Sequence, residues 1–389
     1  MKKVLVFAER MLPSTQTFIP LQVNELRRYR PQYVGLIPAD RNLALPHPPV
    51  MLTQDRGPIS RVRRELYRWT GAASSFHARL RETTADLIHA HFAEGGPAAL
   101  SLSEDLRLPL ILHLRGGAEM LPDHELRRHL FQLPFLARRK RLWQRASLFL
   151  CSSNFIREKA VKAGFPAEKV RVQYTGMDVE GFTITEKSNH KDPNMVLYVG
   201  RLVPYKGCDY LLRAMQQVRQ RRPEAHLVII GDGTFRPQLE PLARELGVRC
   251  QFLGEKPQKE VRTWYERARV FCGPSVTLED GMSEAFGNVF SEAQAMGVPV
   301  VSFHHGGIPE TMQDGITGLL APERDVPMLA EHLLRYLEDD AFWTRSRDQG
   351  MRWIRETFDV RRQTARLEEL YDGVIASFQP GRFRQEAQP

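Results

Sequence analysis

The chain has 389 residues, a hydrophobic content of 42% and a formal net charge of +9 at pH 7. This length allows two domains of ordinary size, and the composition is that of a globular protein rather than a disordered or fibrous one. No apolar run approaches the roughly 18 residues that a membrane span needs, and the four cysteines are too far apart for a zinc or redox motif.

The charge is unevenly distributed along the chain. Residues 1–190 hold 29 Lys/Arg and 18 Asp/Glu, a net charge of +11, whereas the remainder carries −2. A basic first half predicts an anionic partner, such as a membrane surface, a pyrophosphate-linked acceptor or a nucleic acid. Because the sequence contains no nucleic-acid-binding signature and its arginines are not interleaved with aromatic residues, we expect no nucleic-acid partner.

The first elements indicate a strand followed by a polar loop. Residues 4–8 predict the strand, and a charged pair ends this apolar run too early for a signal peptide, so we expect a cytoplasmic protein. Ser14 and Thr17 either bond a substrate or cap the helix expected over 17–28. The basic stretch 61–81 predicts one helix, which is either solvated or lies on anionic lipid headgroups.

Two further strands of the first half end in polar side chains. Residues 86–92 predict a strand on which His89 and His91 share one face, because side chains alternate along a strand. His91 then lies at the carboxyl end, where open α/β sheets bind ligands; a buried structural histidine is the alternative. Residues 123–145 predict a basic amphipathic helix, which either packs on its domain or contacts anionic lipid.

The polar segment 182–194 predicts a linker between two domains, which we place at 1–185 and 193–360. The alternation of strands and helices restarts after it, with a strand at 195–199, a basic loop and a helix at 208–221. This pattern predicts an α/β fold with a doubly wound parallel sheet in each half. Residues 361–389 predict a last helix and a frayed tail.

The stretch 279–310 carries the clearest chemistry. Glu284 lies on a polar loop, Gly287-Asn288 turns the chain, and a short helix at 289–296 carries Glu292. The backbone N–H groups near Gly287, Asn288 and Val289 have no partner within the helix and suit a phosphate. A phosphate cradle between two carboxylates predicts a site for a sugar nucleotide; a surface loop with solvated glutamates is the alternative.

This stretch resembles the Glu-x7-Glu region of the family 4 glycosyltransferases, whose usual run is close to EGFGNVxLEAMAxGxPVV…GGxPE. The resemblance continues in Gly-Arg-Leu-x-x-x-Lys-Gly at 200–207 and Asp-Gly-x-Thr-Gly-Leu-Leu at 314–320. It implies the GT-B architecture: two Rossmann-like lobes with a cleft between them, and a C-terminal helix that returns to the first lobe. The Ser-x-x-Thr-Phe-Ile loop at 14–19 resembles a subgroup that assembles exopolysaccharides or lipid-linked oligosaccharides.

The resemblance implies a role for each matching residue. Glu284 fixes the hydroxyls of the transferred sugar, and Glu292 accepts hydrogen bonds from the ribose. In the first lobe, His91 is the candidate catalytic histidine, and Arg115 replaces a histidine common in the family, where it would stabilise donor phosphate or an acidic acceptor. The remaining donor-binding candidates are Arg201, Lys206, Gly231, Phe286, Gly287, Asn288 and Val289.

The implied reaction is retaining transfer of a sugar from a UDP- or GDP-sugar to a glycan or lipid-linked acceptor. A peripheral position at the inner face of a membrane is the second option for its location in the cytoplasm. No Asp-x-Asp occurs, so we expect two fixed cations rather than a metal ion to neutralise the diphosphate, and no cofactor. Two alternatives stay open. One is an epimerase or hydrolase of the same architecture that uses Glu284 and Glu292 as an acid–base pair, and the other is a non-catalytic sugar-nucleotide-binding subunit.

Overall fold

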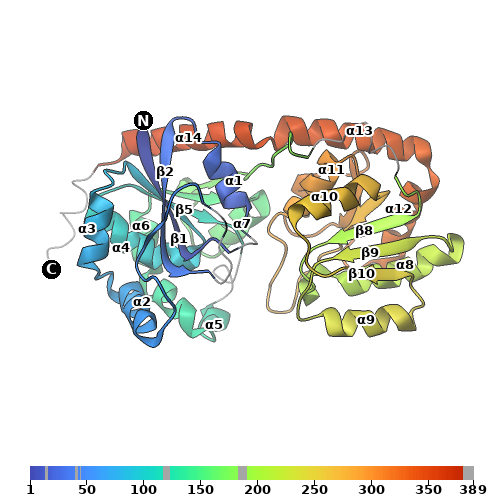
Figure 1. Cartoon of the computed structure of the whole chain (residues 1–389), viewed down its shortest axis with the longest axis horizontal. Helices are drawn as coiled ribbons and strands as arrows, with labels where there is room; N and C mark the ends of the chain where they lie inside the picture. The colour runs from blue at the N-terminus through green and yellow to red at the C-terminus, as the bar shows by residue number, and fades with distance from the viewer. Residues whose placement is uncertain (14–15, 40–42, 44, 117–122, 183–190, 380–389) are drawn as a thin grey trace. The chain divides into compact units, whose positions relative to one another are not determined.

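The computed structural model describes residues 1–13, 16–39, 43, 45–116, 123–182 and 191–379. These residues form two α/β units, each built on one parallel sheet (Figure 1). The first unit comprises Met1–Gly176 and Val360–Pro389, and the second comprises Met177–Asp359. The predicted class, an α/β fold with two doubly wound parallel sheets, is confirmed.

The sheet of the first unit has the strand order β3-β2-β1-β4-β5-β6-β7, and every neighbouring pair is parallel. Its central strands are buried along their whole length, as expected where helices cover both faces of a parallel sheet. The strands are β1 (Lys2–Met11), β2 (Tyr29–Pro38), β3 (Val50–Met51), β4 (Leu87–His91), β5 (Leu110–Leu114), β6 (Leu148–Cys151) and β7 (Val170–Val172).

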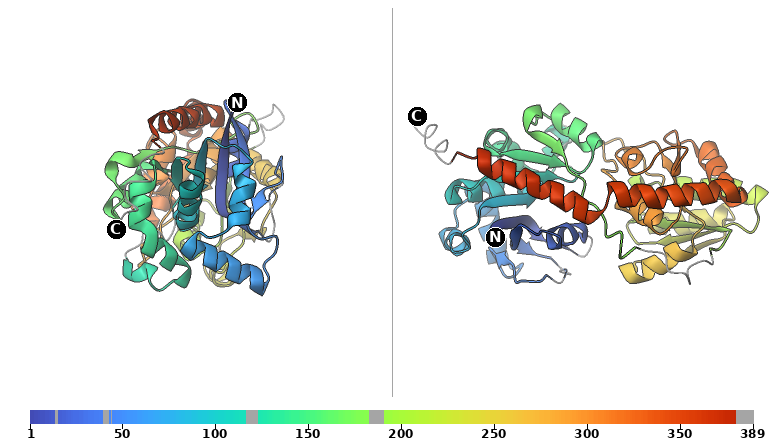
Figure 2. Two further views of the ribbon diagram at one scale, coloured as in Figure 1. Left: turned by 90° about the vertical axis from the view of Figure 1, so that its left-hand side faces the viewer. Right: turned by 90° about the horizontal axis from the view of Figure 1, so that it is seen from above.

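The helices of this unit include the last helix of the chain, α14, whose Leu367, Tyr371 and Val374 join the core formed by β1, β5 and β6. Figure 2 shows α14, in red, running over the first unit. The helices are α1 (Phe18–Asn24), α2 (Pro58–Thr70), α3 (Ser74–Arg81), α4 (Gly96–Leu106), α5 (Asp123–Leu126), α6 (Leu133–Arg145), α7 (Asn154–Lys162) and α14 (Val360–Ser377).

Two predictions of a single helix are wrong, because the structure divides each of these stretches into separate helices. The stretch 61–81 is divided between α2 and α3, because Gly71 ends α2 in the left-handed conformation with φ +72°. The stretch 123–145 is divided between α5, the short 3-10 helix η3 (Leu130–Gln132) and α6. Pro134 lies in the first turn of α6, where its missing N–H costs no helical hydrogen bond, so it starts a helix rather than continuing one.

The second unit has the strand order β10-β9-β8-β11-β12-β13, again parallel throughout. Its strands are β8 (Met195–Val199), β9 (His226–Ile230), β10 (Cys250–Phe252), β11 (Val270–Cys272), β12 (Val300–Phe303) and β13 (Gly318–Ala321). Its helices are α8 (Cys208–Arg221), α9 (Arg236–Glu245), α10 (Gln258–Arg267), α11 (Asn288–Ala295), α12 (Val326–Glu338) and α13 (Asp340–Thr357).

Each sheet has a switch point, a position where the order of strands reverses, and predicted ligand-binding residues follow the strands beside it. The order of strands reverses between β1 and β4 in the first unit and between β8 and β11 in the second. Open parallel sheets bind ligands beyond the carboxyl ends of the strands at such a point. Ser14, most of the predicted linker 182–194 and the tail from 380 lie outside the described residues.

Within the part of the chain that the structure describes, every helix is too short or too polar to cross a membrane.

Candidate functional site

The loops after β8 and β11 carry most of the predicted donor site. Arg201 follows β8 directly, Lys206 ends the short 3-10 helix η6 (Pro204–Lys206), and Glu284 lies on the long loop after β11. Because β8 and β11 are the two strands that flank the switch point, their loops open at the same edge of the sheet.

Glu284 and Lys206 form a nearly buried ion pair. The Lys206 Nζ donates a hydrogen bond to Glu284 Oε2, and their side chains are only 18% and 11% exposed, respectively. Burial acts to raise the pKa of Glu284, but the neighbouring Lys206 ammonium outweighs it and holds that pKa below its usual value. Burial likewise acts to lower the pKa of Lys206, and the Glu284 carboxylate raises it overall. Both residues are therefore charged at neutral pH.

The backbone around Glu284 is held by His305, a residue that the sequence analysis did not single out. The Glu284 N–H donates to His305 Nε2 at 3.1 Å, and His305 Nδ1 lies 3.1 Å from Glu323 Oε2. Since Nε2 accepts a hydrogen bond, the ring proton lies on Nδ1 and points to the carboxylate. The chain Glu323–His305–Glu284 thus fixes the position of the loop.

Gly306 and Gly307 allow the loop after β12 to pack against the backbone of Glu284. The Gly307 N–H donates to the Glu284 carbonyl at 3.1 Å. Gly306 has φ +56°, and a Cβ atom there would lie 2.3 Å from the Glu284 carbonyl oxygen. Only glycine permits this approach, which explains the Gly-Gly pair of the motif.

Arg201 and Lys206 both lie against the ring of Tyr205. The Arg201 Nη2 donates to the Tyr205 hydroxyl at 2.7 Å, and the Arg201 guanidinium and Lys206 ammonium lie 5.9 and 5.4 Å from the ring centroid. Such contacts orient cations without neutralising them. Arg201 is exposed and keeps its charge available for a ligand anion.

The start of α11 lies directly after Phe286 and Gly287. Gly287 precedes the helix with φ +90°, and the first helical N–H groups, those of Asn288 and Val289, have no acceptor within the helix. The Phe286 side chain is buried and packs edge-on against Phe358 with a centroid distance of 5.4 Å, so it anchors this turn from below. The positive end of α11 is therefore available to a phosphate.

Two other predicted residues complete the second unit's site. The Tyr265 hydroxyl lies 3.4 Å from Glu292 Oε2, and burial raises the pKa of Glu292 to about 7. The two glutamates of the motif are thus electrostatically different: Glu284 is paired and charged, and Glu292 changes charge near neutral pH. Gly231 lies where a Cβ atom would be 1.9 Å from the Gly200 carbonyl, so it allows the β9 loop to approach the β8 loop.

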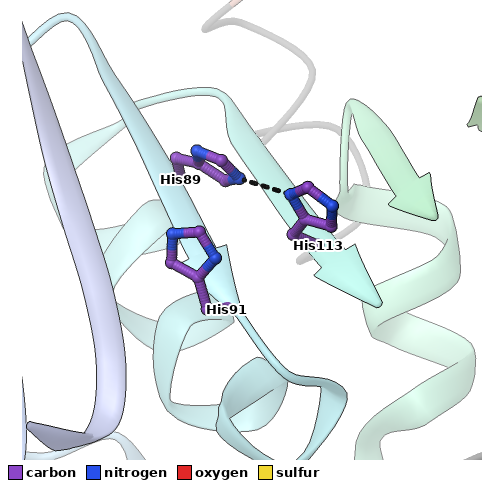
Figure 3. A group of neighbouring side chains, drawn as sticks. All are labelled: His89, His91 and His113. Atoms are coloured by element: carbon purple, nitrogen blue, oxygen red, sulfur yellow. Dashed lines mark hydrogen bonds between the residues drawn. The ribbon is translucent and has the colours of Figure 1, made fainter. Parts of the chain in front are cut away.

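The first unit holds a cluster of three buried histidines on the neighbouring strands β4 and β5 (Figure 3). His89 and His91 share a face, as predicted, with ring centroids 4.3 Å apart. His89 Nε2 lies 3.3 Å from His113 Nδ1 (Figure 3). His89 Nδ1 lies 2.6 Å from the Tyr371 hydroxyl on α14. Burial lowers the pKa of His89 to about 3 and those of His91 and His113 well below their usual value, so all three are neutral.

Arg115 lies beside this cluster as a buried cation. Its Nε donates to His91 Nδ1 at 3.3 Å, and its other hydrogen bonds to described residues reach Thr175 and Gln22; these three partners are neutral. The guanidinium also lies 4.9 Å from the ring centroid of Phe18, and burial lowers its pKa to about 9. At neutral pH Arg115 therefore keeps a charge that these neutral partners do not balance.

The chemistry of this histidine cluster does not favour a metal ion. One nitrogen of each ring lies within 4.8 Å of the others. However, Arg115 donates to His91 Nδ1, which places the ring proton of neutral His91 on Nε2 and leaves no lone pair there for a metal. The adjacent guanidinium charge would also repel a cation.

The predicted residues therefore fall into two groups, one in each unit. Glu284, Glu292, Arg201, Lys206 and the start of α11 lie around one sheet edge of the second unit. His91 and Arg115 meet in the first unit. Thr17 precedes α1 but makes no side-chain capping bond, so the capping alternative is wrong for this residue.

Known protein families match both parts of the chain. Residues 23–180 match the model described as Glycosyltransferase Family 4, and residues 182–353 match the model described as Glycosyl transferases group 1. The chain belongs to the family 4 glycosyltransferases.

Two curated relatives of this family 4 member are named as sugar transferases. The chain is 32% identical to the amylovoran biosynthesis glycosyltransferase AmsK of Erwinia amylovora, over 68% of this chain and 64% of the relative. It is 31% identical to a GDP-mannose-dependent phosphatidylinositol monomannoside mannosyltransferase of Mycolicibacterium smegmatis, over 60% and 64%. The match thus spans just under two thirds of the length of each relative.

A solved structure supports the fold assignment of this family 4 chain. Anabaena Alr3699/HepE in complex with UDP and glucose superimposes with a TM-score of 0.74 at 21% sequence identity. The match covers 95% of this chain and 99% of that structure. At this level of identity the likeness establishes the GT-B fold.

Proposed function

We propose that the chain transfers a sugar from a nucleoside-diphosphate sugar to a hydroxyl group of a glycan or lipid-linked acceptor. The observation that carries this proposal is the charged Glu284–Lys206 pair next to the start of α11. A sugar diphosphate needs cations and N–H donors for its phosphates and an acceptor for its sugar hydroxyls. This edge of the sheet supplies both.

Each group has a distinct role in the proposed donor complex. Arg201, Lys206 and the N–H groups of Asn288 and Val289 bind the diphosphate and stabilise the charge that develops as it departs. The Glu284 carboxylate accepts hydrogen bonds from the sugar and sets the orientation of its anomeric carbon. Glu292 accepts hydrogen bonds from the ribose hydroxyls. Its raised pKa predicts that nucleotide binding favours the ionised form and draws a proton off this carboxyl.

The proposed reaction retains the anomeric configuration and needs no metal. The acceptor hydroxyl attacks on the face from which the diphosphate leaves, and a departing phosphate oxygen takes the proton of that hydroxyl. The C–O bond to the acceptor forms as the bond to phosphate breaks, so no protein nucleophile is required. Because Lys206 and Arg201 supply positive charge where the diphosphate is expected, a divalent cation is not needed for neutralisation.

His91 and Arg115 are assigned to the acceptor in this proposal. His91 is neutral and serves as a hydrogen-bond partner rather than as an acid. Among the residues that the structure describes, the hydrogen-bond partners of charged Arg115 are neutral, which suits a phosphate or carboxylate on a substrate. The names of the curated relatives, which include amylovoran biosynthesis and a phosphatidylinositol monomannoside, support a glycan or a phospholipid acceptor.

Donor binding and transfer are tested separately. A calorimetric screen of UDP- and GDP-sugars against the purified chain identifies the donor, and Lys206→Met should abolish binding of that donor. Transfer to a panel of polyprenyl-pyrophosphate and glycan acceptors is then followed by mass spectrometry, with the anomeric configuration read by NMR. Full activity in excess EDTA is expected. An inverted product, or activity that EDTA removes and magnesium restores, refutes the retaining or the metal-free part of the proposal.

A further inference from the structure

Helix α2 of the first unit carries an exposed apolar stripe. Its inner face packs on the unit through Tyr67, which is fully buried. The stripe runs along one side of the helix, since its members are spaced by three, four and three residues. They are Ile59, Val62, Leu66 and Trp69, with 86%, 68%, 55% and 48% of their surface exposed, respectively.

A second exposed apolar pair borders the same helix. Leu130 and Phe131 of η3 are 79% and 48% exposed. The Phe131 carbonyl accepts a hydrogen bond from Arg68 of α2, so η3 and α2 are neighbours at the surface. Single exposed apolar residues are common on soluble proteins, but a continuous row of large ones indicates a binding surface.

A recess with three arginines and two carboxylates adjoins the stripe. It has a volume of about 860 Å³ and is bordered by Leu66 of the stripe, by Arg63, Arg138 and Arg141, and by Glu104 and Asp105, which pair with Arg141 and Arg81. Arg63 donates to the Ser75 hydroxyl at 3.4 Å, and Arg138 donates to the Pro97 carbonyl at 3.0 Å, so neither of these bonds neutralises a guanidinium. Arg141 pairs with Glu104 at 2.7 Å.

The surrounding sequence is strongly basic. Residues 56–81 and 123–145, which form α2, α3, α5, η3 and α6, together hold 14 Lys/Arg and 3 Asp/Glu. A partner for this face must therefore combine an apolar region, which the stripe can enter, with negative charge beside it. An anionic lipid bilayer combines the two, because its phosphates lie directly above its acyl chains.

We propose that α2 and η3 form a membrane-docking face that lies in the headgroup region of an anionic bilayer. The stripe enters the boundary of the acyl chains, and Arg63 and Arg138 contact lipid phosphates from the recess. A second copy of the chain is a poorer partner, because a symmetric contact would bring two equally basic faces together. The choice of a membrane as the partner rests on the proposed function, in which the acceptor is lipid-linked.

Sedimentation with lipid vesicles tests the proposal on the full chain. We expect the chain to bind vesicles of mixed phosphatidylglycerol and phosphatidylcholine more tightly than pure phosphatidylcholine vesicles, with the difference shrinking at about 1 M NaCl. The double variant Leu66→Ser/Trp69→Ser should weaken binding by about tenfold or more. The two serines do not supply the favourable free energy that Leu66 and Trp69 gain when they move from water into the bilayer. Arg63→Glu should weaken binding to the anionic vesicles only.

Matched controls alter exposed residues outside α2, η3 and the recess. Val161→Ser/Ile316→Ser removes side chains that are 37% and 47% exposed, and Arg213→Glu makes the same charge change on the second unit; both should bind vesicles like the unaltered chain. Absence of binding to anionic vesicles, or equal loss in controls and stripe variants, overturns the proposal. So does a dimer in solution that Leu66→Ser/Trp69→Ser dissociates. Sugar-nucleotide affinity, measured without vesicles, should be unchanged in every variant, so that failure of docking and failure of the proposed transfer are told apart.

Discussion

Replacement of Lys206 by methionine is the sharpest test of the electrostatics around Glu284. Methionine keeps most of the side-chain volume but leaves the Glu284 carboxylate without its cation in a site where only 11% of that side chain is exposed. Removing one partner of a buried ion pair costs about 3–5 kcal/mol. In a unit of the size of Met177–Asp359, a loss of about 3 kcal/mol lowers Tm by about 6–12 °C.

The double variant Lys206→Met/Glu284→Gln separates an unpaired charge from lost packing. Since the glutamine is uncharged, it should recover most of the lost stability while leaving sugar transfer inactive. Chemical denaturation and calorimetry of the wild type, both single variants and the double variant give the coupling between the two side chains. If the double variant is no more stable than Lys206→Met, unpaired charge is not the cause and the reasoning fails.

The pH dependence of the stability of Lys206→Met provides a second test. In the wild type the pKa of Glu284 is lowered, so the pair's contribution is present above the unfolded value of about 4.5 and is lost as pH falls through the folded pKa. Without Lys206, burial raises this pKa, and the variant instead loses stability as pH rises above about 4.5. The stability difference between wild type and Lys206→Met should therefore narrow as pH is lowered toward about 4.

Three further variants probe the remaining parts of the proposed donor site. Burial raises the pKa of Glu292 to about 7. The contribution of this carboxyl to the free energy of unfolding is therefore fully present below about pH 4.5 and is lost as pH rises through 7. Denaturation should show Glu292→Gln gaining up to about 3 kcal/mol over wild type between pH 5 and 8, while calorimetry shows weaker nucleotide binding. Gly306→Ala should abolish activity, because its Cβ would strike the Glu284 carbonyl, whereas Gly315→Ala, with a similar φ of +76° but open space, should cost stability alone. Arg201→Met should raise the donor KM about tenfold with little change in Tm, since Arg201 is exposed; a destabilised variant would instead point to a structural role.

The local elements of the proposed donor site follow closely from the sequence. The loop at 284, the turn at Gly287 and the start of the next helix at 288–289 all lie within one short segment, and neighbouring residues determine them. The strand alternation also predicted both parallel sheets, because central strands such as β5 are continuous apolar runs. Helix breaks were harder to predict. Gly71 and Pro134 each divide a stretch whose amphipathic pattern continues on both sides.

The charge states of the site could not be predicted in this way. Glu284 and Lys206 are 78 residues apart, and His89 and Tyr371 are 282 residues apart. His305 carries no sequence signal beyond its place before Gly306-Gly307, yet it accepts the Glu284 N–H.

The sequence alone determined the class of fold, the family and most of the residues that are candidates for binding a sugar nucleotide. These depend on the order of side chains along short segments, which local backbone preferences and apolar periodicity express directly. Only the tertiary structure decided that Glu284 is charged, that Glu292 titrates near pH 7 and that α2 presents an apolar stripe to solvent. Burial and partners set these properties, and both arise from contacts between segments that are remote in the chain.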